Sequence, residues 1–260
     1  GYFGTLLRRS LNDVLVRRRD ATRLEVELPA DSKTRLDRVR SLVAPTVSRH
    51  HYLKACGGSV SAAVDMAERL LSRGHSLREV EQLLRAMIEP EYPMDDSPVR
   101  IERVGLDGRV SSVTGTILSA EHTRLEVRIG GALSELSRRL EIPEPTDNVI
   151  VRADAETWLA DFVCYSASQS AQARLLSLIT PPELYPYGSQ PLGGGETSIM
   201  PSLRWVDLDI EIVPKRTGQI EVTGVDRLEE LSRMGVVTEA LVANAKEKLN
   251  SAMSSLDLSS

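Results

Sequence analysis

The segment Leu203–Val213, "LRWVDLDIEIV", decides the fold prediction because apolar and acidic residues alternate along it from Val206 onward. Val206, Leu208, Ile210 and Ile212 fall on one side of an extended chain, and the carboxylates fall on the other. A period of two predicts a strand with one buried face. The "KRTG" that follows at 215–218 predicts a turn into another strand, "QIEV".

More strands are predicted upstream of this segment. "VRIERV" (99–104) and "RVSSVTGTIL" (109–118) flank Asp107-Gly108, a dipeptide typical of a tight hairpin. The pentapeptide "TRLEV" occurs at 22–26 and again at 123–127. Because the flanks of the two copies do not align, we interpret them as two separate amphipathic strands that converged on one pattern. "NVIVRA" (148–153) completes a strand-rich middle.

Helical periodicity appears before, within and after these strands. Residues 3–18 and 132–140 have helical spacing, and the apolar run at 154–179 predicts a long helix capped by Asp154. Residues 60–89 predict two helices joined at Gly74, with a capping box from Ser76 to Glu79.

The end of the chain has the same pattern of helix-capping residues. Gly235 is expected to end one helix, and Thr238 is expected to cap the start of the next. We therefore predict an α+β fold with a mostly antiparallel sheet in the middle. The expected parts are a mainly helical 1–92, a strand-rich 99–225 and a C-terminal helical hairpin with its tail at 226–260. The proline-rich stretch at 90–98 marks the first boundary.

The composition of the 260 residues is that of an ordinary globular protein, with 41% hydrophobic and 27% charged residues. No apolar run reaches the roughly 18 residues of a membrane span, and no signal peptide is visible. Two cysteines are too few for a disulfide framework, which favours an intracellular protein, either cytoplasmic or part of a virion. Residues 1–60 carry 12 Lys and Arg against 6 Asp and Glu, whereas the remainder is strongly acidic.

The search for chemistry yields no catalytic residue, no metal site and no cofactor site. His50, His51 and Cys56 lie within seven residues, but adjacent histidines point apart and no fourth zinc ligand has suitable spacing. The glycine-rich stretches at 56–61 and 191–198 lack the lysine of a phosphate-binding loop. The carboxylates of Asp207, Asp209 and Glu211 have the spacing for a divalent cation, although an exposed sheet face needs polar residues there as well.

Two groups of residues are candidates for binding partners. Clustered arginines can neutralise phosphates of a nucleic acid. The candidates for nucleic-acid or anion contact are Arg8, Arg9, Arg17, Arg18, Arg19, Arg35 and Arg38. The long proline- and glycine-rich stretch at 180–202 and the apolar stripe of the last helix are candidates for protein contacts. The residues expected to make them are Tyr185, Tyr187, Leu241, Leu249 and Leu256.

Three functional hypotheses remain open at this point. The leading one is a non-catalytic structural subunit of a shell, nucleocapsid or matrix-type assembly, including viral ones, whose basic and acidic regions attract other copies or other subunits. The second is a nucleic-acid-binding or regulatory protein that uses the basic region 8–49. The third is a divalent-metal-dependent enzyme at the acidic strand.

Overall fold

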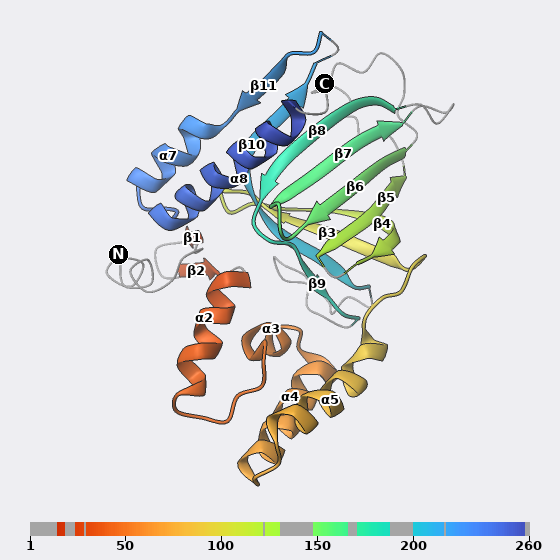
Figure 1. Ribbon diagram of the computed structural model, residues 1–260, viewed down its shortest axis with the longest axis vertical. Coiled ribbons are helices and arrows are strands. Elements are labelled where there is room, and N and C mark those ends of the chain that lie inside the picture. The colour runs from red at the N-terminus through yellow and green to blue at the C-terminus, as the bar shows by residue number, and fades with distance from the viewer. Residues whose placement is uncertain are drawn as a thin grey trace.

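The computed structural model describes residues 15–18, 24–28, 30–121, 123–130, 148–165, 171–187, 200–215 and 217–257 (Figure 1). Its centre is a sheet that closes on itself. The barrel strands are β3 (Pro98–Val104), β4 (Val110–Ala120), β5 (Arg124–Gly130), β6 (Asn148–Asp154), β7 (Leu159–Tyr165), β8 (Ala171–Ile179) and β10 (Ser202–Pro214). They follow one another as antiparallel neighbours from β3 to β8.

Strand β10 closes the barrel because both of its edges are occupied. Its first half, from Ser202 to Val206, pairs with β3 in parallel, and its second half pairs with β8 antiparallel. An irregularity between Asp207 and Ile210 separates the two halves. Two short strands also pair with β10. Strand β9 (Glu183–Tyr185) pairs with its beginning, and strand β11 (Ile220–Thr223) pairs with its end.

The predicted α+β fold with a mostly antiparallel sheet is therefore wrong. The chain has a mostly β fold, a closed mixed barrel of seven strands with helices at its ends. The alternation around Val206–Ile212 identifies a strand correctly, but periodicity reveals only which face is buried. It carries no information on which strands occupy the two edges, and closure depends on those edges.

The barrel interior also explains why the predicted helix at 154–179 is wrong. Of its described residues, Asp154 ends β6, 159–165 form β7 and 171–179 form β8, and β7 pairs with β8. An apolar run without clear alternation fits a buried strand as well as a helix, and here both faces of β7 are covered. The interior cluster draws from every barrel strand and includes Ile101, Ile117, Val127, Val151, Phe162, Leu175, Leu203 and Trp205.

Two C-terminal helices cover one side of the barrel (Figure 1). Helix α7 (Val225–Arg233) and helix α8 (Glu239–Asp257) form the predicted hairpin. Gly235 has φ 74°, and the hydroxyl of Thr238 accepts a hydrogen bond from the amide of Leu241 at 3.1 Å. Both helix boundaries were predicted correctly, because these signals are local.

The N-terminal helices form a separate cluster below the barrel in Figure 1. They are α2 (Ala30–Ser41), α3 (His50–Ala55), α4 (Gly58–Ser72), α5 (Leu77–Ile88) and the 3-10 turn η1 (Glu89–Glu91). The α4–α5 hairpin is confirmed, with Gly74 at φ 92° and the Ser76 hydroxyl accepting from the amide of Glu79.

Strands β1 (Leu15–Arg18) and β2 (Leu24–Glu27) pair with each other, so the predicted helix at 3–18 is wrong at its end. The first "TRLEV" copy contributes to β2 and the second to β5. The predicted helix at 132–140 lies outside the described residues. In the described parts of the chain, no helix is long and apolar enough to cross a membrane.

Candidate functional site

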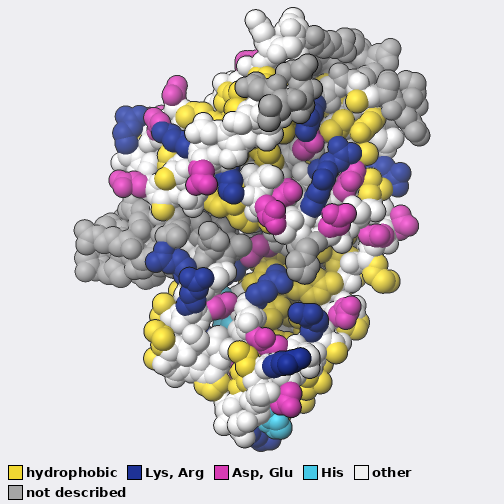
Figure 2. Space-filling view, in the orientation of Figure 1, with side chains coloured by type: hydrophobic (Ala, Val, Ile, Leu, Met, Phe, Trp, Pro, Cys, Tyr) yellow, Lys and Arg dark blue, Asp and Glu magenta, His cyan; other side chains and the backbone are white. Residues whose placement is uncertain are grey.

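A cleft of about 320 Å³ lies between the N-terminal helices and the barrel. Its walls come from α2, from Arg49 and the start of α3, from the β4–β5 connection and from β9. Three cations, Lys33, Arg49 and Arg124, line it together with Tyr52 and Tyr92. Three carboxylates also line it, those of Asp37, Glu121 and Glu183. Figure 2 shows Lys and Arg side chains around an apolar area at this junction.

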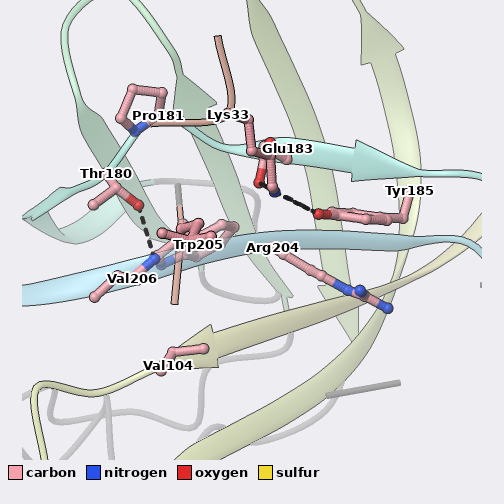
Figure 3. Close-up of a pocket in the computed structure, with 10 residues that line it drawn as sticks. Lys33, Val104, Thr180, Pro181, Glu183, Tyr185, Arg204, Trp205 and Val206 are labelled. Carbon is pink, nitrogen blue, oxygen red and sulfur yellow. Dashed lines mark hydrogen bonds and ion pairs between the residues drawn. The ribbon is translucent and has the colours of Figure 1, made fainter. Parts of the chain in front are cut away.

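Lys33 lies at the inner end of the cleft and connects α2 to β9. Its Nζ donates to Glu183 Oε2 at 2.6 Å and to the hydroxyl of Tyr185 at 2.8 Å (Figure 3). Burial acts to lower the pKa of Lys33, but the negative charge of Glu183 and the Tyr185 hydroxyl outweigh it, so the pKa lies above its usual value. Lys33 is therefore a fixed cation.

A smaller pocket of about 40 Å³ continues behind Lys33. The Arg204 guanidinium lies 4.0 Å from the centre of the Tyr185 ring, and Arg204 Nε donates to Glu102 Oε2 at 2.6 Å. On the opposite wall, Thr180 Oγ1 accepts from the amide of Val206 at 2.9 Å (Figure 3). These contacts hold β9 and β10 in place and fix the floor below Lys33.

The aromatic wall is a connected set of side chains. Arg49 has φ 63°, and its guanidinium lies 4.2 Å from the centre of the Tyr52 ring. The Tyr52 hydroxyl donates to the carbonyl of Leu184 and lies 3.0 Å from the Tyr92 hydroxyl. Burial raises the pKa of both tyrosines, so both rings are neutral at physiological pH.

A histidine–carboxylate pair stands at the edge of the cleft. Asp37, which lines the cleft, has Oδ1 2.7 Å from Nδ1 of His51 and accepts the His51 amide at 2.9 Å. The neighbouring His50 takes a different carboxylate, with Nδ1 2.7 Å from Glu68 Oε1. The two adjacent histidines bind different carboxylates, although their rings lie 5.0 Å apart in an edge-to-face contact, and the Cys56 thiol lies 3.9 Å from the Tyr92 hydroxyl.

The three carboxylates of β10 do not form one acidic face. Asp207 is buried and pairs with Arg103, while Asp209 Oδ2 lies 3.4 Å from Arg227. The irregularity in β10 runs from Asp207 to Ile210 and includes Asp209, which has φ 57°. Burial, with repulsion from Asp207, raises the pKa of Asp209. Within the described ranges, no three His, Cys, Asp or Glu side chains are placed to hold a metal ion.

The other predicted contact residues are dispersed. Arg8, Arg9 and Arg19 lie outside the described residues, and Arg17 and Arg18 belong to β1. Arg35 and Arg38 are exposed on α2.

The predicted protein-contact residues mostly pack against the chain itself. Tyr185 is buried in the N-terminal helical cluster, and Leu241 is buried against the barrel. Leu249 and Leu256 pack beside β8 and β10, and Tyr187 is exposed.

Sequence reasoning missed Lys33, Arg124 and Glu183, which come from three distant elements. Two signals existed. The unusual stretch 180–202 supplies Pro181, Pro182 and Glu183 to the wall, and the second "TRLEV" copy supplies Thr123 to Leu125. The repeated pentapeptide, interpreted as architecture alone, therefore also forms one side of the cleft.

Comparison with known proteins gives a consistent group of relatives. The chain is 30% identical over 223 residues to the probable ribonuclease FAU-1 of Thermococcus kodakarensis, covering 84% of this chain and 44% of that protein. It is 26% identical to the protein of that name from Pyrococcus horikoshii, covering 84% of this chain and 45% of that protein. The chain thus spans a little under half the length of these relatives. No protein-family model matches it.

Among solved structures, the phosphatase SC4828 with a non-hydrolysable nucleotide gives a TM-score of 0.46 at 12% identity, over 64% of this chain and 84% of that one. The complex of FomD with CDP gives 0.44 at 11% identity, over 63% of this chain and 85% of that one.

The relatives overturn the leading functional prediction. They are named as probable ribonucleases, which are enzymes, so the predictions of a non-catalytic structural subunit and of a capsid or virion protein are wrong. The prediction failed because the absence of a short catalytic motif was taken as evidence against an enzyme. The residues that line the cleft come from distant segments of the chain, which a short motif cannot reveal.

Proposed function

We propose that this chain is part of an RNA-processing enzyme and that the cleft between α2, α3 and the barrel binds a single strand of RNA for cleavage. The observation that carries the proposal is the joint lining of this cleft by Arg49, Arg124 and the half-buried Tyr92, in a chain whose relatives are named probable ribonucleases. We also propose a location in the cytoplasm, because RNA processing takes place inside the cell.

The cations suit the phosphate backbone. Lys33 is held by Glu183 and Tyr185, while Arg49, directly before α3, and Arg124, at the start of β5, also line the cleft. Asp37, Glu121 and Glu183 line the same cleft, and Lys33 is paired with Glu183, so the phosphate contacts are assigned to Arg49 and Arg124. Each phosphate that a Lys or Arg neutralises releases counterions, which makes binding favourable and dependent on salt.

An arginine and a tyrosine suit the bases. Tyr52 is 4% exposed and the Arg49 guanidinium covers its ring, so the planar groups open to a base are that guanidinium and the half-buried ring of Tyr92, whose hydroxyl lies 3.0 Å from that of Tyr52. Aromatic rings and planar guanidinium groups stack on bases without demanding a particular sequence. A rigid platform loses little conformational entropy when a base stacks on it.

The size of the cleft favours a single strand over a duplex. Its volume of about 320 Å³ is at the lower end of ligand sites, which span roughly 300–1,000 Å³. Double-stranded RNA is recognised over an extended surface through its grooves, whereas unstacked bases of single strands enter such pockets.

The first test measures binding and cleavage of a labelled single-stranded RNA by the purified chain. We expect Arg49→Ala and Arg124→Ala to weaken binding and to reduce the salt slope by about 0.7 for each lost phosphate contact. Arg85→Ala is the matched control, since Arg85 is exposed on α5 and does not line the cleft.

The proposal fails on either of two results. One is an absence of RNA binding and cleavage by the unaltered chain. The other is equal RNA affinity for the two cleft variants and the Arg85→Ala control.

A further inference from the structure

The outer face of β5 leads from the cleft onto the surface of the barrel. The start of this strand, up to Leu125, lines the cleft. Side chains alternate along a strand, and the apolar residues of β5 lie in the barrel interior, so Arg124, Glu126 and Arg128 share the outer face. Arg124 and Arg128 are both exposed.

Arg128 continues the line of cations beyond the cleft. It lies four residues after Arg124 on an extended strand, which places their Cα atoms about 13 Å apart at about 3.3 Å per residue. The two arginines are therefore neighbours on one face, with Arg124 in the wall of the cleft and Arg128 outside it.

The acidic groups between and beside them already have partners. Glu126 Oε1 accepts from Arg152 Nε at 3.2 Å. The Asp161 carboxylate accepts from Arg174 Nε and Nη2 at 2.9 and 3.1 Å. Figure 2 shows such a mixture of basic and acidic side chains over the barrel. These carboxylates are neutralised by arginines of the neighbouring strands.

Arg124 and Arg128, by contrast, make no ion pair within the part of the chain that the structure describes. Asp154 is the register partner of Arg124, but its Oδ1 accepts two backbone amides of the following turn at 2.7 and 3.1 Å. The register partners of Arg128 are Thr116 on β4 and Ile150 on β6, which carry no charge. The Arg128 guanidinium is therefore open to an anion.

We propose that the RNA strand leaves the cleft along the outer face of β5 and that Arg128 binds one of its phosphates. This inference rests on the proposed function above and extends its site into a track, from Arg49 through Arg124 to Arg128. A guanidinium can bind a phosphate through two parallel hydrogen bonds, which suits an exposed arginine to this contact. Phosphates of a stacked strand recur about every 3.4 Å, so the 13 Å step spans about four nucleotides at most.

The first test measures the affinity of the whole chain for a labelled single-stranded 12-mer RNA over a series of salt concentrations. Arg128→Ala should weaken binding and reduce the salt slope by about 0.7, the value of one phosphate contact on a single strand. Arg128→Lys keeps the charge and should keep the slope. Arg233→Ala is the matched control, since Arg233 is an exposed arginine at the end of α7.

The second test places the RNA on this face directly. A benzophenone attached to Thr116→Cys should cross-link the 12-mer on illumination, because Thr116 lies beside Arg128. The same label on Asn250→Cys, at an exposed position of α8, is the control and should give no more than background. The two native cysteines are buried, so the label is directed to the introduced thiol. Melting curves establish that each variant is folded.

Equal affinity and salt slope for Arg128→Ala and Arg233→Ala overturn the track, and so does a cross-link from Thr116→Cys no stronger than from Asn250→Cys. The proposed function then still stands if Arg49→Ala and Arg124→Ala weaken binding. Absence of RNA binding by the unaltered chain overturns both.

Discussion

Glu102 and Arg204 lie on the two parallel strands that close the barrel and form a buried ion pair, with Arg204 Nε 2.6 Å from Glu102 Oε2. Their side chains are only 2% and 10% exposed. Arg204 also lies over the Tyr185 ring and donates to the Ser202 hydroxyl. The pair therefore links barrel closure to the floor of the candidate cleft.

Removing one partner of this pair should destabilise the folded protein. Glu102→Ala leaves the Arg204 charge buried without its carboxylate, and such changes cost about 3–5 kcal/mol. The double variant Glu102→Met with Arg204→Met removes both charges and should recover much of this loss. Denaturant unfolding of both variants measures the difference. Equal destabilisation of the single and double variants would show that the uncompensated charge is not the cause.

Gly224 should tolerate no side chain. A Cβ there would lie 1.8 Å from the Asp209 carbonyl oxygen, and the backbone has φ 91°. Gly224→Ala should therefore cost more than about 4 kcal/mol, the range of exceptional substitutions. Gly218 has a similar φ of 83° with nothing within 4 Å of its Cβ position, so Gly218→Ala should cost only about 1–2 kcal/mol. Similar melting temperatures for the two variants would contradict this.

Asp209→Asn should stabilise the protein at neutral pH. Burial and the nearby Asp207 raise the pKa of Asp209, so the folded state binds the proton more tightly than the unfolded state. The contribution of Asp209 to the free energy of unfolding therefore falls as the pH rises through the raised pKa. Asn removes the charge and tolerates φ 57°.

We expect a gain of about 1–3 °C in melting temperature at pH 7. The gain should vanish at a pH below the ordinary pKa of an aspartate, where the wild-type group is neutral in both states. A gain of the same size at both pH values would mean that charge is not the source of the effect.

Both thiols should be unreactive in the folded protein. Cys56 is 2% exposed and Cys164 is fully buried, and burial raises the pKa of each to about 11. Because the thiolate is the reactive form, iodoacetamide should label them only as fast as the chain opens. Labelling followed by mass spectrometry, with and without denaturant, measures this. Fast labelling of either cysteine without denaturant would contradict the described burial.

The sequence allowed prediction of elements whose signals are local. The hairpins at Gly74 and Gly235 follow from glycine and capping residues within a few positions, and the strand at Val206–Ile212 follows from alternation. The apolar run at 154–179 was ambiguous because burial on both faces removes alternation. Closure of the barrel had no local signal, since it pairs residues of β3 and β10 about a hundred positions apart.

The candidate cleft also has no local signal in the sequence. Lys33, Arg124 and Glu183 have no shared motif, and only the folded chain brings them together. His51 was evaluated from its sequence neighbours His50 and Cys56 as a zinc ligand. Its actual partner, Asp37, lies 14 residues earlier, on a different helix. The acidic strand offered the strongest local pattern, but Asp207 is paired with Arg103, and Asp209 lies beside Arg227.

The parallel β3–β10 pair has a consequence for synthesis of the chain on the ribosome. Strands β3 to β8 can pair in order as they emerge, because each is antiparallel to the one before it. The edges of β3 and β8 stay open until residues 202–214 have left the exit tunnel. For that interval the nascent chain exposes two unpaired strand edges, which are sites of aggregation. A pause in translation before Ser202 would prolong this exposure, whereas a pause after Pro214 would not.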